Sequence, residues 1–509
     1  MALDSPSTTS TTTNPTWYAT IRNMFNTMDV SHMRAQGIDL ANYNDVKNHA
    51  GDIYQQVAAG NMPPGAPWPP TSVATFLTWM NNGYPKGQPS RALLTTNLAT
   101  QRSRPETRIR KDITTLTPPE LDLLKTAFTA IMAKSSTDPD SYFVQAGYHW
   151  YPAPNTYCMH HVPGYNPWHR AYMLSFENAL RSVPGCEQLT LPYWDITTPF
   201  PEVLKSPPFA SYTLPEAVSP DYPQGYVTQR FDYATIQQNL LNYGVTADIN
   251  RALTKTDWED FNGFFAGAAY NTIIAAHDSG HNSIGPTMQD QGVAAFDPVF
   301  WFFHCNWDRL FWLWQSKVGA TDLNGLISTI NKETDPLSYQ IFTDSSLEAL
   351  NPFSGAPLHL KTTNIIDSVN SLHVGYEISP TFAASDTLPK TQISAFASEK
   401  LLVDTTRVNV SVQGVNRLKI PGSFSVHLLK DGKVIASKGF FQPVEVEQCA
   451  TCVENAIVRF DFELPLESVA GGRLSVWVEP VNKSFVGDRF PNKLMGNPTI
   501  EVHLLMSTE

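Results

Sequence analysis

The segment from Asp297 to Ser316 is apolar on almost every face of the helix that its sequence predicts. Asp297 can cap that helix, and Pro298 suits its first turn. A helix without a polar face has to be buried on all sides, so the fold is expected to wrap around this segment. Charged and polar residues, His304 among them, interrupt the apolar run, which excludes a membrane span.

Three more segments before residue 300 are predicted to be helices. Thr117 can cap a helix whose first turn holds two prolines, and Glu120 completes a capping box. Apolar residues at helical spacing predict a helix from Asn166 to Val183, and Ala- and Phe-rich sequence predicts another from Trp258 to about His281. The region before residue 385 is therefore expected to be mainly helical.

After about residue 385 the pattern changes to that of strands. Apolar and polar residues alternate in 408–412, 458–464, 474–478 and 500–504. Lys430-Asp431-Gly432-Lys433 predicts a hairpin turn. This pattern is typical of an antiparallel β-sandwich, and a segment rich in Ser, Thr, Pro and Ala, from Ser379 to Gln392, is expected to be the linker before it.

The chain is therefore predicted to combine a mainly α domain with a C-terminal antiparallel β-sandwich. The expected boundaries are a disordered Ser/Thr-rich tail over 1–15, a helical N-terminal extension over 16–104, the α domain over 105–385 and the sandwich over 386–509.

Charge and cysteine content exclude several functions. Lys and Arg number 35 against 47 Asp and Glu, a net charge of −12, which argues against binding nucleic acid or an anionic membrane surface. Five cysteines do not make a disulfide framework. The N-terminus has neither the basic nor the apolar part of a signal peptide, so we expect a reducing, cytoplasmic location.

Seven of the thirteen histidines lie between residues 149 and 304. His277 and His281 are four residues apart on a predicted helix, so both rings leave the same face and can share a metal ion. His304 lies on the apolar helix, where a buried imidazole needs a polar partner. These three histidines form one candidate metal set.

A second set consists of His149, His160 and His169. His161 is expected to point away from it, because adjacent side chains of an extended segment face opposite sides. Two three-histidine sets on packed helices indicate a metal pair inside a helical bundle, and neutral imidazole suits copper, zinc, iron and nickel. The sequence has neither the glutamate of HExxH nor a Glu-x-x-His, which argues against a zinc peptidase and a carboxylate-bridged di-iron site.

The motifs around these histidines resemble those of the tyrosinase and polyphenol oxidase family, the type-3 copper proteins. The matching pieces are 146–149 (AGYH), 158–160 (CMH), 168–170 (WHR), 277–281 (HDSGH), 296–301 (FDPVFW) and 304–309 (HCNWDR). RKD at 110–112 resembles the opening of the family's catalytic domain, and NPF at 351–353 and GYE at 375–377 resemble its end. The C-terminal sandwich is similar to the shielding domain of fungal-type pro-tyrosinases.

The resemblance implies a four-helix-bundle core with a dicopper centre that binds dioxygen. His149, His160 and His169 would hold the first copper, and His277, His281 and His304 the second. The implied reaction oxidises small phenols or catechols to ortho-quinones and reduces oxygen to water. Two other functions use the same site: an o-aminophenol oxidase and a haemocyanin-like oxygen carrier. The substrate and the oligomeric state, including a homo-oligomer, stay open.

Asp278 follows the first histidine of the second set, where members that hydroxylate monophenols often carry Asn. Its carboxylate could accept a phenol proton or orient an imidazole, and the sequence does not decide between these roles. Phe303 stands where many members have a histidine adjacent to the ligand, and the ligand position itself, His304, is retained.

The resemblance also assigns roles to three cysteines. In fungal members a cysteine spaced like Cys158 is joined to the second histidine by a thioether, which predicts a Cys158–His160 link; the alternative is a free buried thiol. Cys449 and Cys452 form the one CxxC motif. In fungal pro-tyrosinases this motif is associated with copper loading, whereas a disulfide or an idle pair is the alternative here.

Phe440 and Phe441 follow a predicted strand of the sandwich. Consecutive side chains at a strand end point to opposite sides, so one ring should leave the core of the sandwich. In the resembling zymogens a side chain of this domain enters the mouth of the active site. We therefore predict that Phe440, or failing that Phe441, fills the dicopper pocket; an oligomer contact or packing on the linker is the alternative.

Overall fold

The structure is a computed structural model of the full chain. It describes residues 15–86 with gaps at 18–19, 26, 35, 37 and 64–66, residues 107–377 with gaps at 153–156, 158, 264–271 and 348, and residues 401–481 and 495–508. The predicted tail and the predicted linker lie almost wholly outside the described residues. The chain forms two compact units, Met1–Arg104 and Pro105–Glu509.

The first unit is a small helical body with a core of its own. Its elements are η1 (Ile21–Met24), α1 (Thr27–Arg34), α2 (Tyr43–Asn48), α3 (Ala50–Ala58) and α4 (Pro70–Asn81). Aliphatic and aromatic side chains share this core, where Phe76 and Trp79 are fully buried and Trp17 packs against Trp79. The helical extension predicted before residue 105 is thus helical where it is described.

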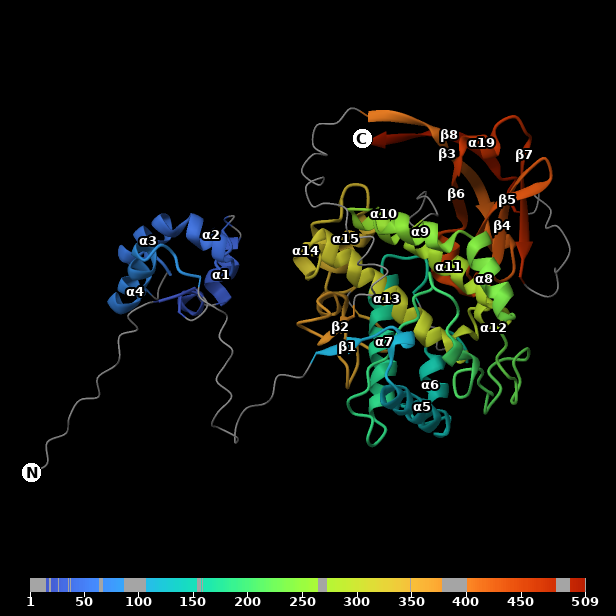
Figure 1. Ribbon diagram of the computed structural model, residues 1–509, viewed down its shortest axis with the longest axis horizontal. Helices are drawn as coiled ribbons and strands as arrows, with labels where there is room; N and C mark the ends of the chain where they lie inside the picture. The colour runs from blue at the N-terminus through green and yellow to red at the C-terminus, as the bar shows by residue number, and fades with distance from the viewer. Residues whose placement is uncertain are drawn as a thin grey trace, which may run out of the picture. The chain divides into compact units, whose positions relative to one another are not determined.

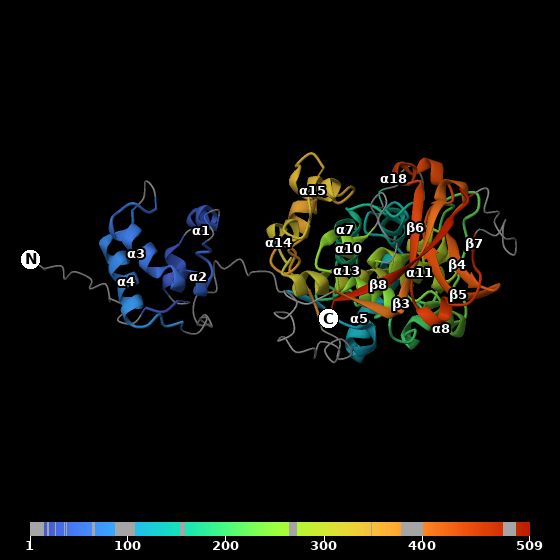
Figure 2. The ribbon, with the colours of Figure 1, turned by 90° about the horizontal axis from the view of Figure 1, so that it is seen from above.

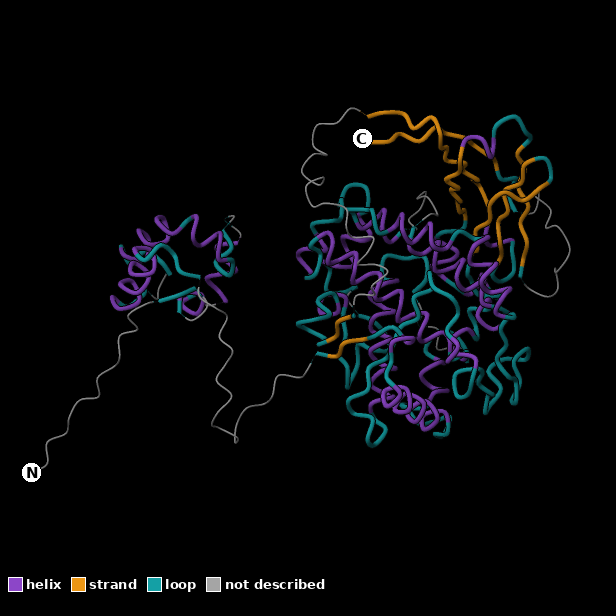
Figure 3. Tube along the Cα trace, in the orientation of Figure 1, coloured by secondary structure: helices purple, strands orange, loops and turns teal. Residues whose placement is uncertain are grey.

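The second unit begins with a helix-rich region (Figures 1 and 3). Its helices are α5 (Pro118–Met132), α6 (Tyr142–Gly147), α7 (Tyr165–Arg181), α8 (Tyr233–Asn242), α9 (Val245–Ala252), α10 (Trp258–Asn262), α11 (Ile273–Ile284), α12 (Pro286–Gln289), α13 (Val299–Val318), α14 (Leu323–Ile327), α15 (Pro336–Thr343) and α16 (Thr362–Ile365). Among the described residues, no helix has both the length and the apolar character needed to cross a bilayer.

Helix α13 is the buried centre of this region, as its sequence predicts. Every residue from Val299 to Phe311 is buried, and α7 packs along it, with Trp301 stacked on Phe176 at 3.5 Å between ring centroids. The predicted cap differs in detail. The helix begins one residue later, and Asp297 accepts a hydrogen bond from Val299 N at 3.0 Å while it also pairs with Arg230.

The prediction of one long helix from Trp258 to His281 is wrong. The chain forms two helices there, α10 and α11, because Gly263 ends α10 with a φ of +69°, a conformation that suits glycine. The predicted start of α5 is present: Thr117 and Glu120 form the capping box, with a Thr117 N to Glu120 Oε2 hydrogen bond of 2.8 Å.

A short parallel pair, β1 (Arg108–Arg110) and β2 (Val374–Tyr376), joins the two ends of the helix-rich region. Arg110, fully buried, pairs with Glu177 of α7 at 3.2 Å and with Asp308 of α13 at 3.1 Å. Arg170 of α7 pairs with the same Asp308 at 2.6 Å. This ion network fixes α7 and α13 against each other one residue from His169 and one turn from His304.

The C-terminal part consists of two antiparallel three-stranded sheets. The strands are β3 (Leu401–Asn416), β4 (Phe424–Lys430), β5 (Lys433–Phe440), β6 (Ile457–Pro465), β7 (Leu474–Pro480) and β8 (Thr499–Thr508), in the orders β6-β3-β8 and β5-β4-β7. Asp431 and Gly432 make the predicted β4–β5 turn with φ of +50° and +80°. A helix-rich region followed by antiparallel sheets confirms the predicted fold class.

Strand β5 lies against α11, and both views place the strands beside this helix (Figures 1 and 2). Gly439 makes this contact possible, since a Cβ atom there would lie 2.9 Å from Ser279 Cα. Asn282 Nδ2 of α11 donates to the carbonyl of Phe424 at 2.9 Å, and the buried pair Lys438–Asp248 joins β5 to the neighbouring helix α9. The sandwich is thus docked directly on the helix that carries His277 and His281.

Candidate metal centre

The structure brings all six predicted histidines together in one buried site. His149 follows α6, His160 lies in the loop before α7, and His169 is on α7; His277 and His281 are on α11, and His304 is on α13. None is more than 6% exposed. Within each set, one nitrogen of every ring lies within 4.8 Å of the others.

The two sets face each other. His160 stacks on His277 with ring centroids 5.4 Å apart, and His169 stacks on His304 at 4.7 Å. Within the second set, the Nε2 atoms of His281 and His304 are 3.2 Å apart. Imidazoles from three helices and the loops between them therefore converge on one small volume, which is the arrangement that a metal pair requires.

The outward nitrogen of four rings is held by an oxygen of the chain. Backbone carbonyls of Gln291, Tyr165 and Met288 lie 2.8–3.0 Å from the Nδ1 atoms of His149, His169 and His281, in that order. Asp278 Oδ1 lies 2.8 Å from His277 Nδ1. A hydrogen bond to Nδ1 fixes the tautomer and leaves Nε2 as the ligand atom.

The inward nitrogens of His149 and His277 are buried and have no hydrogen-bond partner. An orphaned buried polar atom is costly, and a metal ion satisfies it. Burial also lowers the pKa of His149 to about 3 and lowers the pKa of each of the other five. The rings are therefore neutral near pH 7, the form that binds metal. The donor set fits a pair of copper ions.

Asp278 is fully buried and accepts three hydrogen bonds. His161 Nε2 lies 2.7 Å from it and His277 Nδ1 2.8 Å, and the backbone N–H of Phe441 donates at 2.9 Å. Burial alone would raise the pKa of Asp278, but the interactions with the two histidines outweigh it and lower the pKa. Asp278 is therefore an ionised carboxylate bonded to the outward nitrogen of His277.

His161 is not part of either set, and its backbone is in the left-handed region, with a φ of +55°. That conformation turns its ring away from the site of His160 and onto Asp278. It also contacts the sandwich, where its ring stacks on Phe440 at 4.5 Å. His161 thus joins the histidine site to the C-terminal domain.

The prediction that the Phe440 ring fills the histidine site is wrong. The Phe441 ring, which was predicted as the alternative, lies in the site. The Phe441 ring stacks on His281 at 3.8 Å and 12° between planes and lies 5.3 Å from His160, so it contacts both sets. Phe440 pairs in register with Phe424 and stacks on it at 4.9 Å, inside the sandwich core. The register of β5 decides which ring leaves the domain.

Cys449 and Cys452 form a disulfide. In this state neither sulfur is a thiolate, so the pair does not offer the ligands that copper loading would use. The predicted partner of His160, Cys158, lies outside the described residues. Cys186 and Cys305 are free buried thiols.

The family model for the common central domain of tyrosinase matches residues 139–227 and 202–317, which contain all six histidines. The part of the chain that holds the histidine site is thus similar to the central domain of tyrosinases. A tyrosinase of Aspergillus oryzae is 28% identical over 330 residues, 42% of this chain and 61% of that protein. Haemocyanin units G and H of Sepia officinalis are 26% identical over 290 residues, 52% of this chain and 48% of theirs.

A solved structure has the same fold. The apo-pro-tyrosinase of Aspergillus oryzae matches with a TM-score of 0.59 at 17% identity, over 80% of this chain and 94% of that one. The match to the tyrosinase family model implies a dinuclear copper site, and the two histidine sets fit such a site. Because the matches include both a tyrosinase and a haemocyanin, they leave the specific activity open.

The backbone groups that hold the outward nitrogens of the histidines are not predictable from the sequence. The carbonyls of Tyr165, Met288 and Gln291 have no side-chain signature, so no sequence pattern could have identified them. The pairing of His161 with Asp278 joins residues 117 positions apart. The RKD motif at 110–112 and Asp308 were recognised as family motifs, but their role in one ion network appears only in the structure.

Proposed function

We propose that this protein is a copper-dependent oxidase of phenols and catechols that produces ortho-quinones and reduces oxygen to water. The observation that carries the proposal is the pair of buried, neutral histidine sets facing each other inside a tyrosinase domain. His149, His160 and His169 would hold one copper, and His277, His281 and His304 the other. Copper, when bound, would supply the redox chemistry.

The residues of the chain place and shield the substrate. The Phe441 ring marks the position of an aromatic ring, stacked on His281 and close to His160. A phenol in that position would present its oxygen to the space between the two sets. Phe300 and Phe303 lie with ring centroids 4.1 Å from His304 and 4.6 Å from His281, and these apolar walls exclude water.

The role proposed for Asp278 is to position His277. Its carboxylate accepts hydrogen bonds from His277 on Oδ1 and from His161 and the Phe441 N–H on Oδ2. A phenol could give its proton to Oδ2 only after Phe441 has left, because two donors already bond to that oxygen. In the closed state the carboxylate can therefore only orient the His277 imidazole. Transfer of a phenol proton to it would require the C-terminal domain to move.

We also propose that the C-terminal domain is a lid and that the structure describes its closed state. Phe441 is fully buried in the core of the tyrosinase domain. It occupies the space that a substrate ring needs, so substrate and lid exclude each other. Movement or removal of the domain would open the site.

A thioether between Cys158 and His160 is proposed on the family resemblance. It would fix the ring of His160 before oxygen binds. Intact mass after copper loading should then fall by two hydrogens, and peptide mapping should place the loss on the Cys158–His160 peptide. A Cys158 that is freely alkylated in denatured, active protein would refute the link.

A substrate panel tests the proposed function. The copper-loaded chain is compared on a monophenol, a catechol and an o-aminophenol, with copper measured per chain. Turnover of the catechol with two coppers supports the proposal. Reversible oxygen binding without turnover, in both the full chain and a chain lacking the C-terminal domain, would favour the haemocyanin-like function. Preferred turnover of the aminophenol would favour the o-aminophenol oxidase.

A further inference from the structure

The two cysteines of the disulfide Cys449–Cys452 differ in exposure. Cys449 is partly buried, whereas Cys452 is only 3% exposed. The two residues are three apart at the start of α18 (Ala450–Glu454). An external thiolate should therefore reach Cys449 more readily than Cys452, which makes the sulfur of Cys452 the leaving group.

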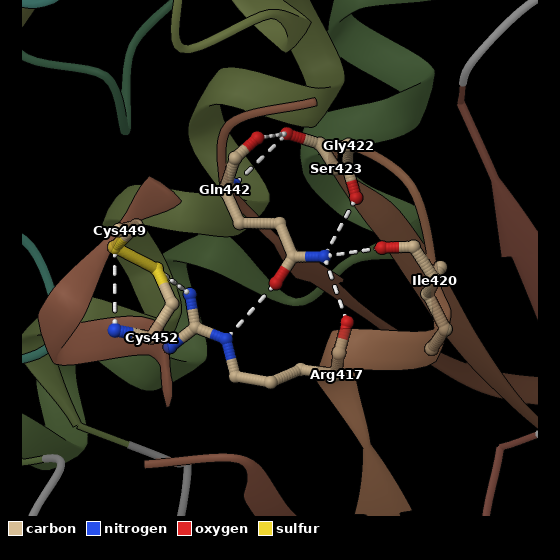
Figure 4. Close-up of a disulfide and its surroundings, with 7 residues drawn as sticks. All are labelled: Arg417, Ile420, Gly422, Ser423, Gln442, Cys449 and Cys452. Atoms are coloured by element: carbon tan, nitrogen blue, oxygen red, sulfur yellow. Dashed lines mark hydrogen bonds between the residues drawn. A yellow bond between two sulfur atoms is a disulfide. The ribbon is translucent and has the colours of Figure 1, made fainter. Parts of the chain in front are cut away.

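A buried cation contacts the leaving sulfur. Arg417, in η5 (Arg417–Lys419), is fully buried, and its Nη2 donates to Cys452 Sγ at 3.0 Å (Figure 4). A guanidinium next to a sulfur stabilises the thiolate that forms when the disulfide opens. The pair thus has an accessible sulfur to attack and a stabilised leaving group, which thiol–disulfide exchange requires.

The same arginine holds the residue that follows the lid ring. Arg417 Nε donates to Gln442 Oε1 at 3.0 Å, and Gln442 Nε2 donates to the carbonyls of Arg417, Ile420 and Gly422 at 2.7–3.2 Å (Figure 4). Gln442 N donates to Ser423 Oγ at 3.1 Å. Gln442 is fully buried and directly follows Phe441, so two side chains connect the disulfide to the lid.

Arg417 also lies over the ring of Phe440, 4.7 Å from its centroid. Phe440 in turn stacks on His161, the partner of Asp278. A change at Cys452 therefore reaches the histidine site through both phenylalanines, by way of Gln442 to Phe441 and by way of Phe440 to His161.

We propose that Cys449–Cys452 is a thiol–disulfide exchange site for a small thiol or a dithiol reductant, and that its reduction loosens the segment that holds Phe441 in the histidine site. A thiolate of the reductant attacks Cys449, a mixed disulfide forms, and the electron pair of the broken bond leaves on Cys452 as a thiolate. A second thiol of the reductant then attacks the mixed disulfide and releases Cys449, which takes up a proton. The protein gains two electrons, and the reductant becomes a disulfide.

The consequence for the lid follows from Arg417. Reduction converts the acceptor at Cys452 from a neutral sulfur into a thiolate, which attracts the guanidinium more strongly. The guanidinium is then drawn toward Cys452, and the separate hydrogen bond from its Nε to Gln442 Oε1 is stretched. The segment 439–442 loses part of its anchor, and its backbone hydrogen bonds open more often. This step rests on the proposed lid function, whereas the exchange chemistry does not.

The first test counts thiols and measures amide exchange on the full chain under native conditions. Millimolar dithiothreitol should make Cys449 and Cys452 alkylatable while Cys186 and Cys305 stay as protected as before. Hydrogen exchange of the amides of Phe441 and Gln442 should then accelerate about tenfold or more. A disulfide that resists reduction in the folded chain overturns the exchange site, and reduction without faster exchange at 439–442 overturns the coupling.

Trapping of the mixed disulfide tests which sulfur is attacked. The oxidised full chain is treated briefly with reduced glutathione, a monothiol, quenched with acid and mapped by peptide mass. The glutathione should be found on Cys449 about tenfold more often than on Cys452, or more; equal labelling, or a preference for Cys452, would overturn the assignment. Neither readout needs copper or turnover, so a chain without oxidase activity would refute the proposed function and leave this test intact.

Discussion

Replacing Phe441 by Ala should open the histidine site without undocking the sandwich. The ring is fully buried against His281 and His160. Burial of a phenylalanine side chain contributes about 1.5–3 kcal/mol. A substrate has to displace the ring, so without it the substrate no longer competes against that burial energy. The apparent substrate affinity should then rise about 10- to 150-fold, because each 1.4 kcal/mol is about tenfold in affinity.

The domain is expected to stay docked in this variant because polar contacts elsewhere hold it. Asn282 still donates to the carbonyl of Phe424, Tyr243 still bonds to Ser425 at 2.7 Å, and the Lys438–Asp248 pair is unaffected. The apparent KM for a catechol, measured on the copper-loaded full chain, should therefore fall by that factor. Unfolding in urea should remain cooperative.

Phe460→Ala is the matched control. Phe460 is also a fully buried ring of the sandwich, and it packs on Phe440 and Phe424 rather than on a metal-site histidine. It should destabilise the domain by a comparable amount and leave KM nearly unchanged. An unchanged KM in Phe441→Ala would refute occupation of the substrate position by its ring, and an equal fall in both variants would mean that general loosening, not the ring, opens the site.

Three further changes test the site and its scaffold. His281→Ala should reduce copper below two per chain while far-ultraviolet circular dichroism is retained; undiminished copper, or zinc in place of copper, would contradict the ligand set. Asp278→Asn weakens the hydrogen bond that orients His277 and should change the ratio of monophenol to catechol turnover more than it changes copper content, and an unchanged ratio leaves Asp278 a purely structural role. Glu120→Gln should lower the free energy of unfolding at pH 7 by about 1 kcal/mol. Hydrogen bonds from Lys111 and Thr117 lower the pKa of Glu120 from 4.5 to about 2. The urea midpoints of wild type and variant should therefore converge as the pH falls through that interval, because Glu120 becomes protonated. A difference between the midpoints that does not change with pH would refute the capping role.

The parts of the fold that were predictable are those set by local chemistry. The capping box at Thr117 specifies where α5 begins, and the Asp431-Gly432 turn specifies the β4–β5 hairpin. The break between α10 and α11 was missed because a single glycine inside an apolar pattern is tolerated in many helices. Whether Gly263 ends the helix depends on the tertiary contacts around it.

The choice between Phe440 and Phe441 illustrates the same limit. Side chains alternate along a strand, so the sequence alone predicts that the two rings point to opposite sides. Which of them enters the sandwich depends on the register of β5 with β4, which pairs Phe440 with Phe424. A register shift of one residue exchanges the faces, and the sequence of one strand does not contain that information.

Helix α11 connects the lid to the histidine site, because its residues contact both. His277 and His281 occupy the face toward the histidine cluster, while Asp278, Ser279 and Asn282 bind the sandwich through Phe441 N, Gly439 N and the carbonyl of Phe424. Asp278 takes part in both, since it orients His277 and accepts the Phe441 amide. Withdrawal of the lid therefore removes the Phe441 hydrogen bond from a buried carboxylate that also accepts from His161 and His277. Movement of the lid and the orientation of His277 are thus coupled through one side chain.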